Sequence, residues 1–187
     1  MVHSPSKPLT LKDFLALPEG ETAYELVDGA AIPKVSPKFF HSTSQKNLLF
    51  LLDPWSRGQG RVMPEWAVVL KRNQEDWVPI PDLLYVSYEP LPVEWMEDSA
   101  CPVAPELVIE IISPGQSFGG MTEKATDYLA AYVLRVWVLD PKVQSVTVFA
   151  PDSLPKTYRG NAAIADNLLP NLTLTAQQIF QASGVIS

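Results

Sequence analysis

Two acidic residues stand in segments whose other residues are mostly apolar. Asp82 follows a proline in VPIPDLLYV, and Glu110 lies in ELVIEII, between Ile109 and Ile111. Moving a carboxylate into an apolar environment is costly unless the carboxylate is paired or binds a cation. Each acid therefore calls for a partner, and Lys124, further along the chain, is a candidate.

These residue types can support metal chemistry. A hard cation such as Mg²⁺ prefers oxygen ligands, so two carboxylates, a backbone carbonyl and a phosphate oxygen would form a site. Asp82 and Glu110 could supply the carboxylates, and the Ile111 carbonyl could approach the same ion at a strand end. The Lys124 ammonium could orient the attacking water and offset charge developing on the phosphoryl group. With Glu25 in YELVDG, the set matches phosphodiester hydrolysis that uses Mg²⁺, or Mn²⁺ as its substitute.

A structural explanation stays open for each member of this set. Asp82 could cap a turn, and Glu110 and Lys124 could form an ion pair that serves the fold alone. Glu25 could face solvent or pair with Lys34. The residue types alone do not decide between these alternatives and a catalytic site.

Composition limits the class of protein. The chain has 187 residues, of which 47% are hydrophobic and 19% charged, which predicts one globular domain over residues 1–187. The single cysteine, Cys101, excludes an intramolecular disulfide and favours a reducing compartment, so the cytoplasm is expected. No apolar segment reaches the length of a membrane span, and the N-terminal residues do not resemble a signal peptide.

The charge distribution bears on nucleic-acid binding. The formal net charge of -7 argues against a polyanionic partner. The stretch between Ala30 and Arg72 is nevertheless basic, with Lys34, Lys38, Lys46, Arg57, Arg61, Lys71 and Arg72. This stretch could form a phosphate-facing patch, to which Lys38 and Lys46 would contribute substrate contacts, or it could be an ordinary solvated surface. His41, at an expected helix start, could contact substrate or serve as a surface or capping residue.

The first half of the chain predicts three elements. Thr10 and Asp13 indicate a capped short helix that stops near Pro18. AYELVDGAAIPKV predicts a β-hairpin that turns at the Asp-Gly pair of residues 28 and 29. Residues 39–52 fit a helix that ends at Asp53 and Pro54.

The second half predicts a sheet. Two strand candidates are RVMPEWAVVL and WVPIPDLLYVS. Residues 88–105 are expected to form a proline-rich loop. The segment ELVIEII predicts a central strand that is buried on both faces. We then expect a helix over 121–134, capped by Thr122, and a hairpin from RVWVLDP to SVTVFA. The last expected elements are a strand in LPKTYRG and a short helix in LTAQQIFQASG. Strands mixed with a few helices predict an α/β or α+β fold.

Several stretches, taken in order, resemble a known family. They are YELVDG, His41 after SPKFF, PDLLYV, PELVIEIISP and EKATDYLAAYVLRVWVLDP. Together they are similar to the bacterial family of restriction-endonuclease-like proteins, formerly a domain of unknown function, in the PD-(D/E)XK nuclease superfamily. The resemblance covers roughly residues 11–149. It implies a mixed β-sheet core flanked by helices, preceded by an N-terminal helix and hairpin, and a divalent-metal site.

By this resemblance, Asp82 and Glu110 match the two acids, and Lys124 matches a lysine that has moved from the strand to the following helix. Two positions after Glu110, where the superfamily's lysine usually stands, this chain has Ile112. Glu25 resembles the family's acid on an early element. The glycine pair at 119–120 stands where similar sequences commonly carry an Arg-Asp pair, so any substrate contact of that pair is lost.

Three functions remain open at this level. The favoured hypothesis is an Mg²⁺-dependent endonuclease acting on DNA, which by resemblance is expected to be a homodimer. The second is a catalytically silent nucleic-acid-binding or regulatory protein that keeps the fold. The third is an interaction protein that uses its tryptophans (Trp55, Trp66, Trp77, Trp95 and Trp137) at an interface, although most of them suit a core better.

Overall fold

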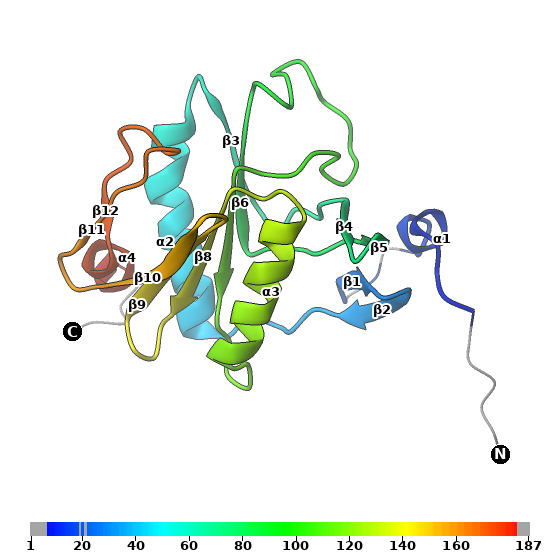
Figure 1. Ribbon diagram of the computed structural model, residues 1–187, viewed down its shortest axis with the longest axis horizontal. Helices are drawn as coiled ribbons and strands as arrows, with labels where there is room; N and C mark the ends of the chain where they lie inside the picture. The colour runs from blue at the N-terminus through cyan, green and yellow to red at the C-terminus, as the bar shows by residue number, and fades with distance from the viewer. Residues whose placement is uncertain (1–6, 19, 21, 183–187) are drawn as a thin grey trace.

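A six-stranded mixed sheet forms the centre of the fold (Figure 1). The computed structural model describes residues 7–18, 20 and 22–182. The strand order is β10-β9-β8-β7-β6-β3, with bounds β3 Gly60–Pro64, β6 Leu83–Ser87, β7 Leu107–Ile111, β8 Arg135–Asp140, β9 Ser145–Ala150 and β10 Ser153–Arg159. Strands β7 and β8 run parallel, and the other neighbours pair antiparallel.

Strand β7 is buried along its whole length, as its apolar sequence predicts. Leu107, Ile109 and Ile111 pack into the core on one face of the sheet. Val108 packs into the core on the other face. By strand alternation Glu110 shares the face of Val108, so its carboxylate points into an interior layer rather than into solvent.

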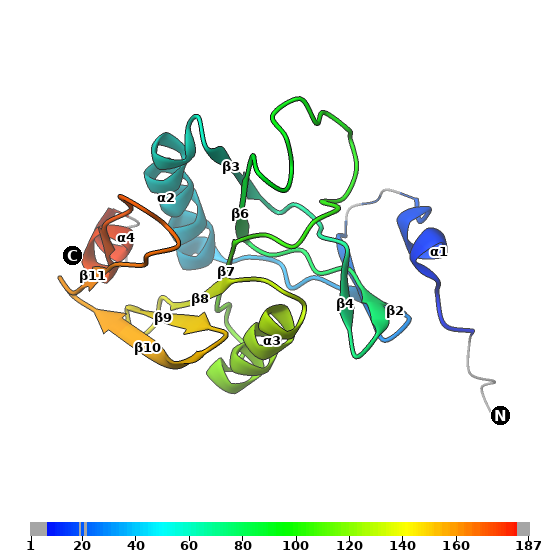
Figure 2. The ribbon, with the colours of Figure 1, turned by 45° about the horizontal axis from the view of Figure 1, so that its top comes forward.

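Helices cover both faces of the sheet. Helix α2 (Phe39–Ser56) and helix α4 (Ala176–Ala182) lie on the face of Leu107, and α3 (Phe118–Ala130) lies on the opposite face (Figure 2). Helix α3 connects the parallel strands β7 and β8, as a crossover must. The expected mixed sheet flanked by helices is confirmed. No helix in the described part of the chain is long and apolar enough to cross a membrane.

The N-terminal elements lie on the side of the molecule opposite α4 (Figure 1). Helix α1 (Leu11–Leu15) has the predicted N-cap at Thr10, which forms a capping box with Asp13. Strands β1 (Tyr24–Val27) and β2 (Ala30–Pro33) form the predicted hairpin. Its turn residues Asp28 and Gly29 have φ of 50° and 73°. Smaller hairpins are formed by β4 (Leu70–Arg72) with β5 (Glu75–Trp77), and by β11 (Ala163–Ile164) with β12 (Leu174–Thr175).

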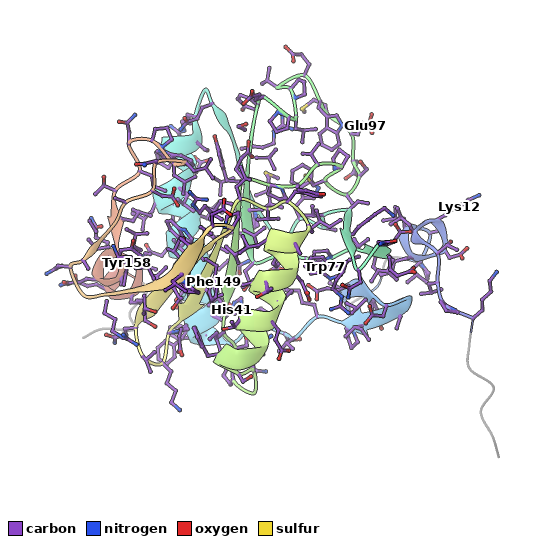
Figure 3. All side chains as sticks on the ribbon, viewed as in Figure 1. Lys12, His41, Trp77, Glu97, Phe149 and Tyr158 are labelled. Carbon is purple, nitrogen blue, oxygen red and sulfur yellow. The ribbon has the colours of Figure 1, made fainter. Side chains whose placement is uncertain are left out.

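Two of the five tryptophans are buried in the interior, and Trp55, Trp66 and Trp95 are half-buried. Trp77 and Trp137 are each 2% exposed or less. Trp77 lies beside α3, where its ring is 4.7 Å from that of Tyr128 (Figure 3). In the same view Glu97 stands on the outer loop between β6 and β7, the region predicted to be a long loop. These two tryptophans stabilise the core and are not available to a partner.

Several boundaries differ from the sequence prediction. Helix α2 continues through Pro54 to Ser56, because the Trp55 indole donates to the Pro170 carbonyl at 2.9 Å and so anchors the last turn. Helix α3 spans Phe118–Ala130 with Ser117 as its cap, so the predicted bounds of 121–134 and the cap assigned to Thr122 were wrong. The first strand candidate ends at Pro64, and its remainder enters the β4–β5 hairpin.

Gly60 is required by the close packing of β3 on β6. A Cβ at this position would lie 2.5 Å from the Tyr85 ring and 2.5 Å from the Val86 carbonyl oxygen. We expect Gly60→Ala to reduce the free energy of unfolding by about 1–3 kcal/mol, because the sheet must shift to admit the methyl group. Denaturant unfolding of both variants measures this, with Gly119→Ala as control, since its Cβ meets only Ser117 at 3.9 Å. Equal stability of the two variants would contradict the packing described.

Candidate functional site

The two predicted acids lie side by side at one end of the sheet. Asp82 immediately precedes β6, and Glu110 is in β7. Because Leu83 pairs with Ile109 in this antiparallel ladder, Asp82 falls opposite Glu110. The Ile111 N–H donates to Asp82 Oδ2 at 2.7 Å, and the two acids are only 2% and 5% exposed. The sheet therefore buries two carboxylates in direct proximity.

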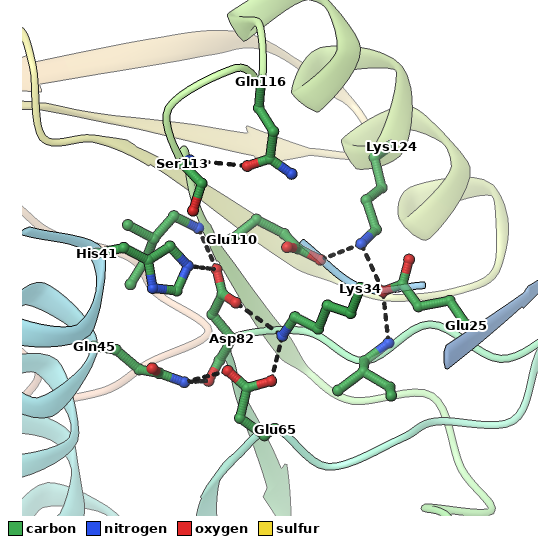
Figure 4. Close-up of polar contacts among 12 residues, drawn as sticks. Glu25, Lys34, His41, Gln45, Glu65, Asp82, Glu110, Ser113, Gln116 and Lys124 are labelled. Carbon is green, nitrogen blue, oxygen red and sulfur yellow. Dashed lines mark hydrogen bonds and ion pairs between the residues drawn. The ribbon is translucent and has the colours of Figure 1, made fainter. Parts of the chain in front are cut away.

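Asp82 is held by polar groups from two further elements (Figure 4). His41 Nε2 lies 2.9 Å from its Oδ2, and the Lys34 ammonium donates to Oδ1 at 2.9 Å. Gln45 donates to its backbone carbonyl at 2.8 Å. Burial by itself would raise the pKa of Asp82, but the His41 hydrogen bond and the Lys34 charge hold that pKa below its ordinary value. Asp82 is therefore an anion.

Lys34 joins Asp82 to a further acid, Glu65. Its ammonium forms an ion pair with each carboxylate. Burial would lower the pKa of Lys34, yet the charges of Asp82 and Glu65 raise that pKa above its ordinary value. A permanent positive charge thus occupies one side of Asp82.

Lys124 reaches back from α3 to the other acids. Its Nζ lies 3.0 Å from Glu110 Oε1 and 2.9 Å from Glu25 Oε1. Glu25 also accepts the Ile80 N–H at 2.8 Å, which fixes its orientation. The departure at Ile112 is therefore compensated in space, because a lysine from the following helix contacts the second acid. All four residues predicted to be catalytic, Glu25, Asp82, Glu110 and Lys124, lie in one cluster.

The environment of Glu110 opposes its ionisation. Burial, with the nearby charges of Asp82 and Glu25, raises the pKa of Glu110 to about 7 despite the attraction of Lys124. The Tyr128 hydroxyl donates to Glu110 Oε1 at 2.8 Å, and burial raises the pKa of Tyr128, so that the phenol keeps its proton. Burial also acts against the charge of Lys124, but the carboxylates of Glu110 and Glu25 raise the pKa of Lys124 above its ordinary value. Lys124 is thus an ammonium and not a base.

The pKa of Glu110 predicts a pH-dependent stability. Because the folded protein binds this proton more tightly than the unfolded chain, the stabilisation is present below about pH 4.5 and is lost as pH rises through about 7. Glu110→Gln, which resembles the protonated acid, should match the wild type at low pH. At about pH 8 it should be more stable by about 3 kcal/mol. The charged or titratable groups that face Glu110 are Lys124, Asp82, Glu25, Lys34 and Tyr128.

Thermal unfolding of the wild type and the Glu110→Gln variant in chelator, across this pH range, measures the difference directly. Subtracting the two proteins cancels the titrating groups that do not interact with Glu110. Glu123→Gln is the matched control, since Glu123 is an exposed neighbour on the same helix as Lys124. A stability difference that does not change with pH would contradict the assignment.

The donor set fits a hard divalent cation. Four carboxylates (Glu25, Glu65, Asp82 and Glu110) face two ammonium groups (Lys34 and Lys124), so the cluster keeps a negative surplus. Within residues 7–18, 20 and 22–182, no three His, Cys, Asp or Glu side chains are placed to hold a metal ion on their own. An ion at Asp82 and Glu110 would therefore complete its shell with backbone, water or substrate oxygens, as Mg²⁺ commonly does.

The predicted substrate-binding residues lie in different settings. His41 is buried and contacts Asp82, whereas Lys38 and Lys46 are exposed on or next to α2. The other basic side chains of the 30–72 stretch are engaged within the chain: Lys34 with Asp82 and Glu65, Arg57 with Asp53, Arg61 with the carbonyls of Pro92 and Val93, Lys71 with Asp76, and Arg72 with Asp28 and Asp127. The stretch is thus largely neutralised internally.

The sequence reasoning did not assign Lys34, Gln45, Glu65 and Tyr128 to the site. Helical spacing could have found two of them, since Gln45 follows His41 and Tyr128 follows Lys124 at the i+4 position. No local pattern identifies Lys34 or Glu65, because their contacts join segments distant in sequence.

A mixed sheet with helices on both faces, and with two buried acids at the ends of adjacent strands, defines a restriction-endonuclease-like fold. The Uma2 family model, described as "Putative restriction endonuclease", matches residues 11–177. The chain belongs to this family, which supports nuclease function at the level of class. The resemblance inferred from the sequence is confirmed.

A solved crystal structure shares the fold. It is described as a putative nuclease belonging to DUF820 from Anabaena variabilis ATCC 29413, and it matches with a TM-score of 0.82 and 26% sequence identity. The match covers 94% of this chain and 99% of that chain. Comparison with curated proteins gave no significant match.

Proposed function

We propose that this protein is a divalent-metal-dependent endonuclease that hydrolyses phosphodiester bonds in DNA. The observation that carries the proposal is the pair of buried carboxylates, Asp82 and Glu110, with the Lys124 ammonium 3.0 Å from the second acid. Buried carboxylates so close together are stable only if one of them binds a proton or cations offset their charge. Membership in a family described as restriction endonucleases supports phosphodiester chemistry.

Each residue has a separate role in this proposal. Asp82 and Glu110 would hold the cation, Mg²⁺ or Mn²⁺, with the Ile111 carbonyl as an additional ligand. The bound ion would supply Lewis acidity toward the phosphoryl group. Lys124, as an ammonium, orients the attacking water and stabilises the developing negative charge. Glu25 holds Lys124 in position through their ion pair, and the Ile80 N–H orients Glu25 by donating to its carboxylate.

Cleavage of supercoiled plasmid tests this function. Purified protein should nick or linearise the plasmid in Mg²⁺ or Mn²⁺, lose this activity in chelator and regain it when the ion is restored. A single-stranded DNA and an RNA of the same sequence, run beside the plasmid, identify the preferred nucleic acid. Cleavage that persists in chelator, or no cleavage of any substrate with either ion, would contradict the proposal.

Lys34 supports a second candidate, a protein that keeps the fold and binds nucleic acid without cleaving it. Its ammonium already neutralises Asp82, so a divalent cation must compete with a charge built into the chain.

We expect Lys34→Met to bind Mn²⁺ about tenfold more tightly than the wild type, because this competing charge is gone. Calorimetric titration with Mn²⁺ measures the change, and Lys46→Met, an exposed lysine on α2, is the matched control. If both variants bind Mn²⁺ like the wild type, Lys34 does not compete for this site.

We also propose that the active form is a homodimer, since cutting both strands of a duplex requires two sites related by symmetry. Sedimentation equilibrium should give twice the mass of one chain at micromolar concentration. A strictly monomeric protein that still linearises plasmid would contradict the homodimer but not the nuclease function.

A further inference from the structure

A hollow of about 870 Å³ opens beside the carboxylate cluster. Its walls come from the start of α2, the segment between β7 and α3, and the turn between β8 and β9. In Figure 1 the starts of α2 and α3 and the turn between β8 and β9 all lie at the lower end of the sheet. The volume lies within the range of pockets that take small organic ligands.

Exposed aromatic side chains line this hollow. Phe39 is 70% exposed, Phe40 52% and Phe118 44%. The rings of Phe39 and Phe40 pack edge to face with centroids 5.5 Å apart, so at most one face of one ring is covered by the other ring. Exposed phenylalanine faces are costly in water and are suited to stacking against a planar, apolar ligand.

The edges of the hollow favour a negatively charged group. Lys38 and Lys142 are exposed at its margin. Helices α2 and α3 both begin at the hollow, and neither has an acidic residue in its first turn. The one carboxylate of the lining, Asp140, accepts the backbone N–H groups of Lys142 and Val143 at 2.9 and 3.3 Å, so part of its acceptor capacity is already used within the turn.

His41 lies between the hollow and the carboxylate cluster and contacts both. This residue lines the hollow and is also 2.9 Å from Asp82. Its other ring nitrogen, Nδ1, is buried and has no hydrogen-bond partner among the described residues. A ligand in the hollow would therefore lie next to the groups proposed to act on phosphate.

We propose that this hollow binds an unpaired nucleotide of the substrate, next to the phosphodiester to be cleaved. The base stacks on the phenylalanine side chains, and the phosphates lie toward Lys38, Lys142 and the two helix N-termini. In an intact duplex the bases are stacked on each other, so these rings reach a base only in single-stranded or locally unpaired DNA. The proposal deepens the nuclease function and rests on it for the position of the scissile bond.

Binding measured in chelator tests the hollow without relying on cleavage. The probes are a fluorescent single-stranded oligonucleotide, its duplex, and a single strand of equal length with abasic sites. We expect the wild type to bind the single strand about tenfold more tightly than the abasic strand or the duplex. The Phe39→Ala/Phe40→Ala double variant should lose this tenfold preference, whereas Phe50→Ala should keep it, because Phe50 is equally exposed on α2 and lies outside the hollow.

Equal affinity of wild type and double variant for the single strand, with both proteins folded by circular dichroism, would overturn the proposal. Equal affinity of the wild type for the abasic strand and the intact single strand would also overturn the proposal, since charge alone would then explain the binding. Binding that follows the expected pattern without any cleavage in Mg²⁺ would support the hollow and reject the nuclease function. Cleavage in Mg²⁺ by a protein that shows no preference for the single strand over the abasic strand would support the nuclease function and reject the hollow as a binding site.

Discussion

Asp82→Asn should reduce metal-dependent cleavage of plasmid by about 10³-fold or more. The variant keeps the size of the side chain and an acceptor for the Ile111 N–H, but it removes the negative charge that holds the cation. Loss of one preorganised electrostatic group in an active site commonly costs 10²–10³ in rate, and here a metal ligand is lost as well. The measurement is the initial rate of nicking in Mg²⁺, with protein purified in parallel.

Asp53→Asn is the matched control for this experiment, because Asp53 is an exposed aspartate on α2 whose ion pair with Arg57 is on the surface. It should nick plasmid at the wild-type rate. If Asp82→Asn also retained that rate while folded, the carboxylate at the start of β6 would have no part in the reaction, and the observed nicking would come from elsewhere.

Lys124→Met should reduce cleavage by about 10²-fold without weakening Mn²⁺ binding. The ammonium lies between Glu25 and Glu110, and its raised pKa keeps it charged at neutral pH. Its proposed role is to stabilise negative charge in the transition state, a role that affects the turnover number rather than the binding of the ion. Single-turnover rates at saturating Mn²⁺ separate the two effects.

Lys12→Met serves as the control for Lys124→Met, since Lys12 is exposed on α1 and far from the site. A Lys124→Met variant whose rate recovers fully at high Mn²⁺ would show that Lys124 supports metal binding and not the chemical step. That outcome would require a different explanation for the charge at this position.

The sequence was informative where residue type and strand pattern coincide. Asp82 and Glu110 could be paired in advance because each is a single acid in an apolar strand segment, and adjacent strands bring such positions together. Lys124 was a candidate partner from its residue type, and the resemblance to the family then matched it to the lysine of the following helix. The central strand, the first hairpin and the capped α1 followed from local patterns that the tertiary structure did not override.

The remaining features depend on contacts between distant segments. Lys34 follows β2 and looks like a surface lysine in the sequence, yet its partners Glu65 and Asp82 are brought to it by β3 and β6. The end of α2 was misplaced because Pro54 usually stops a helix, whereas here Trp55 is anchored on the Pro170 carbonyl. The hollow beside His41 was not predicted, because its walls come from segments that only the fold brings together.

The most direct measurement is to locate Mn²⁺ by anomalous diffraction from a crystal grown or soaked with the ion. The proposed function predicts a peak between the carboxylates of Asp82 and Glu110, with the Lys34 ammonium displaced from Asp82. A fully soaked crystal without a peak at these carboxylates, and with Lys34 still bound to Asp82, would contradict the metal-dependent mechanism. The cluster would then be a set of structural ion pairs in a protein that keeps the nuclease fold.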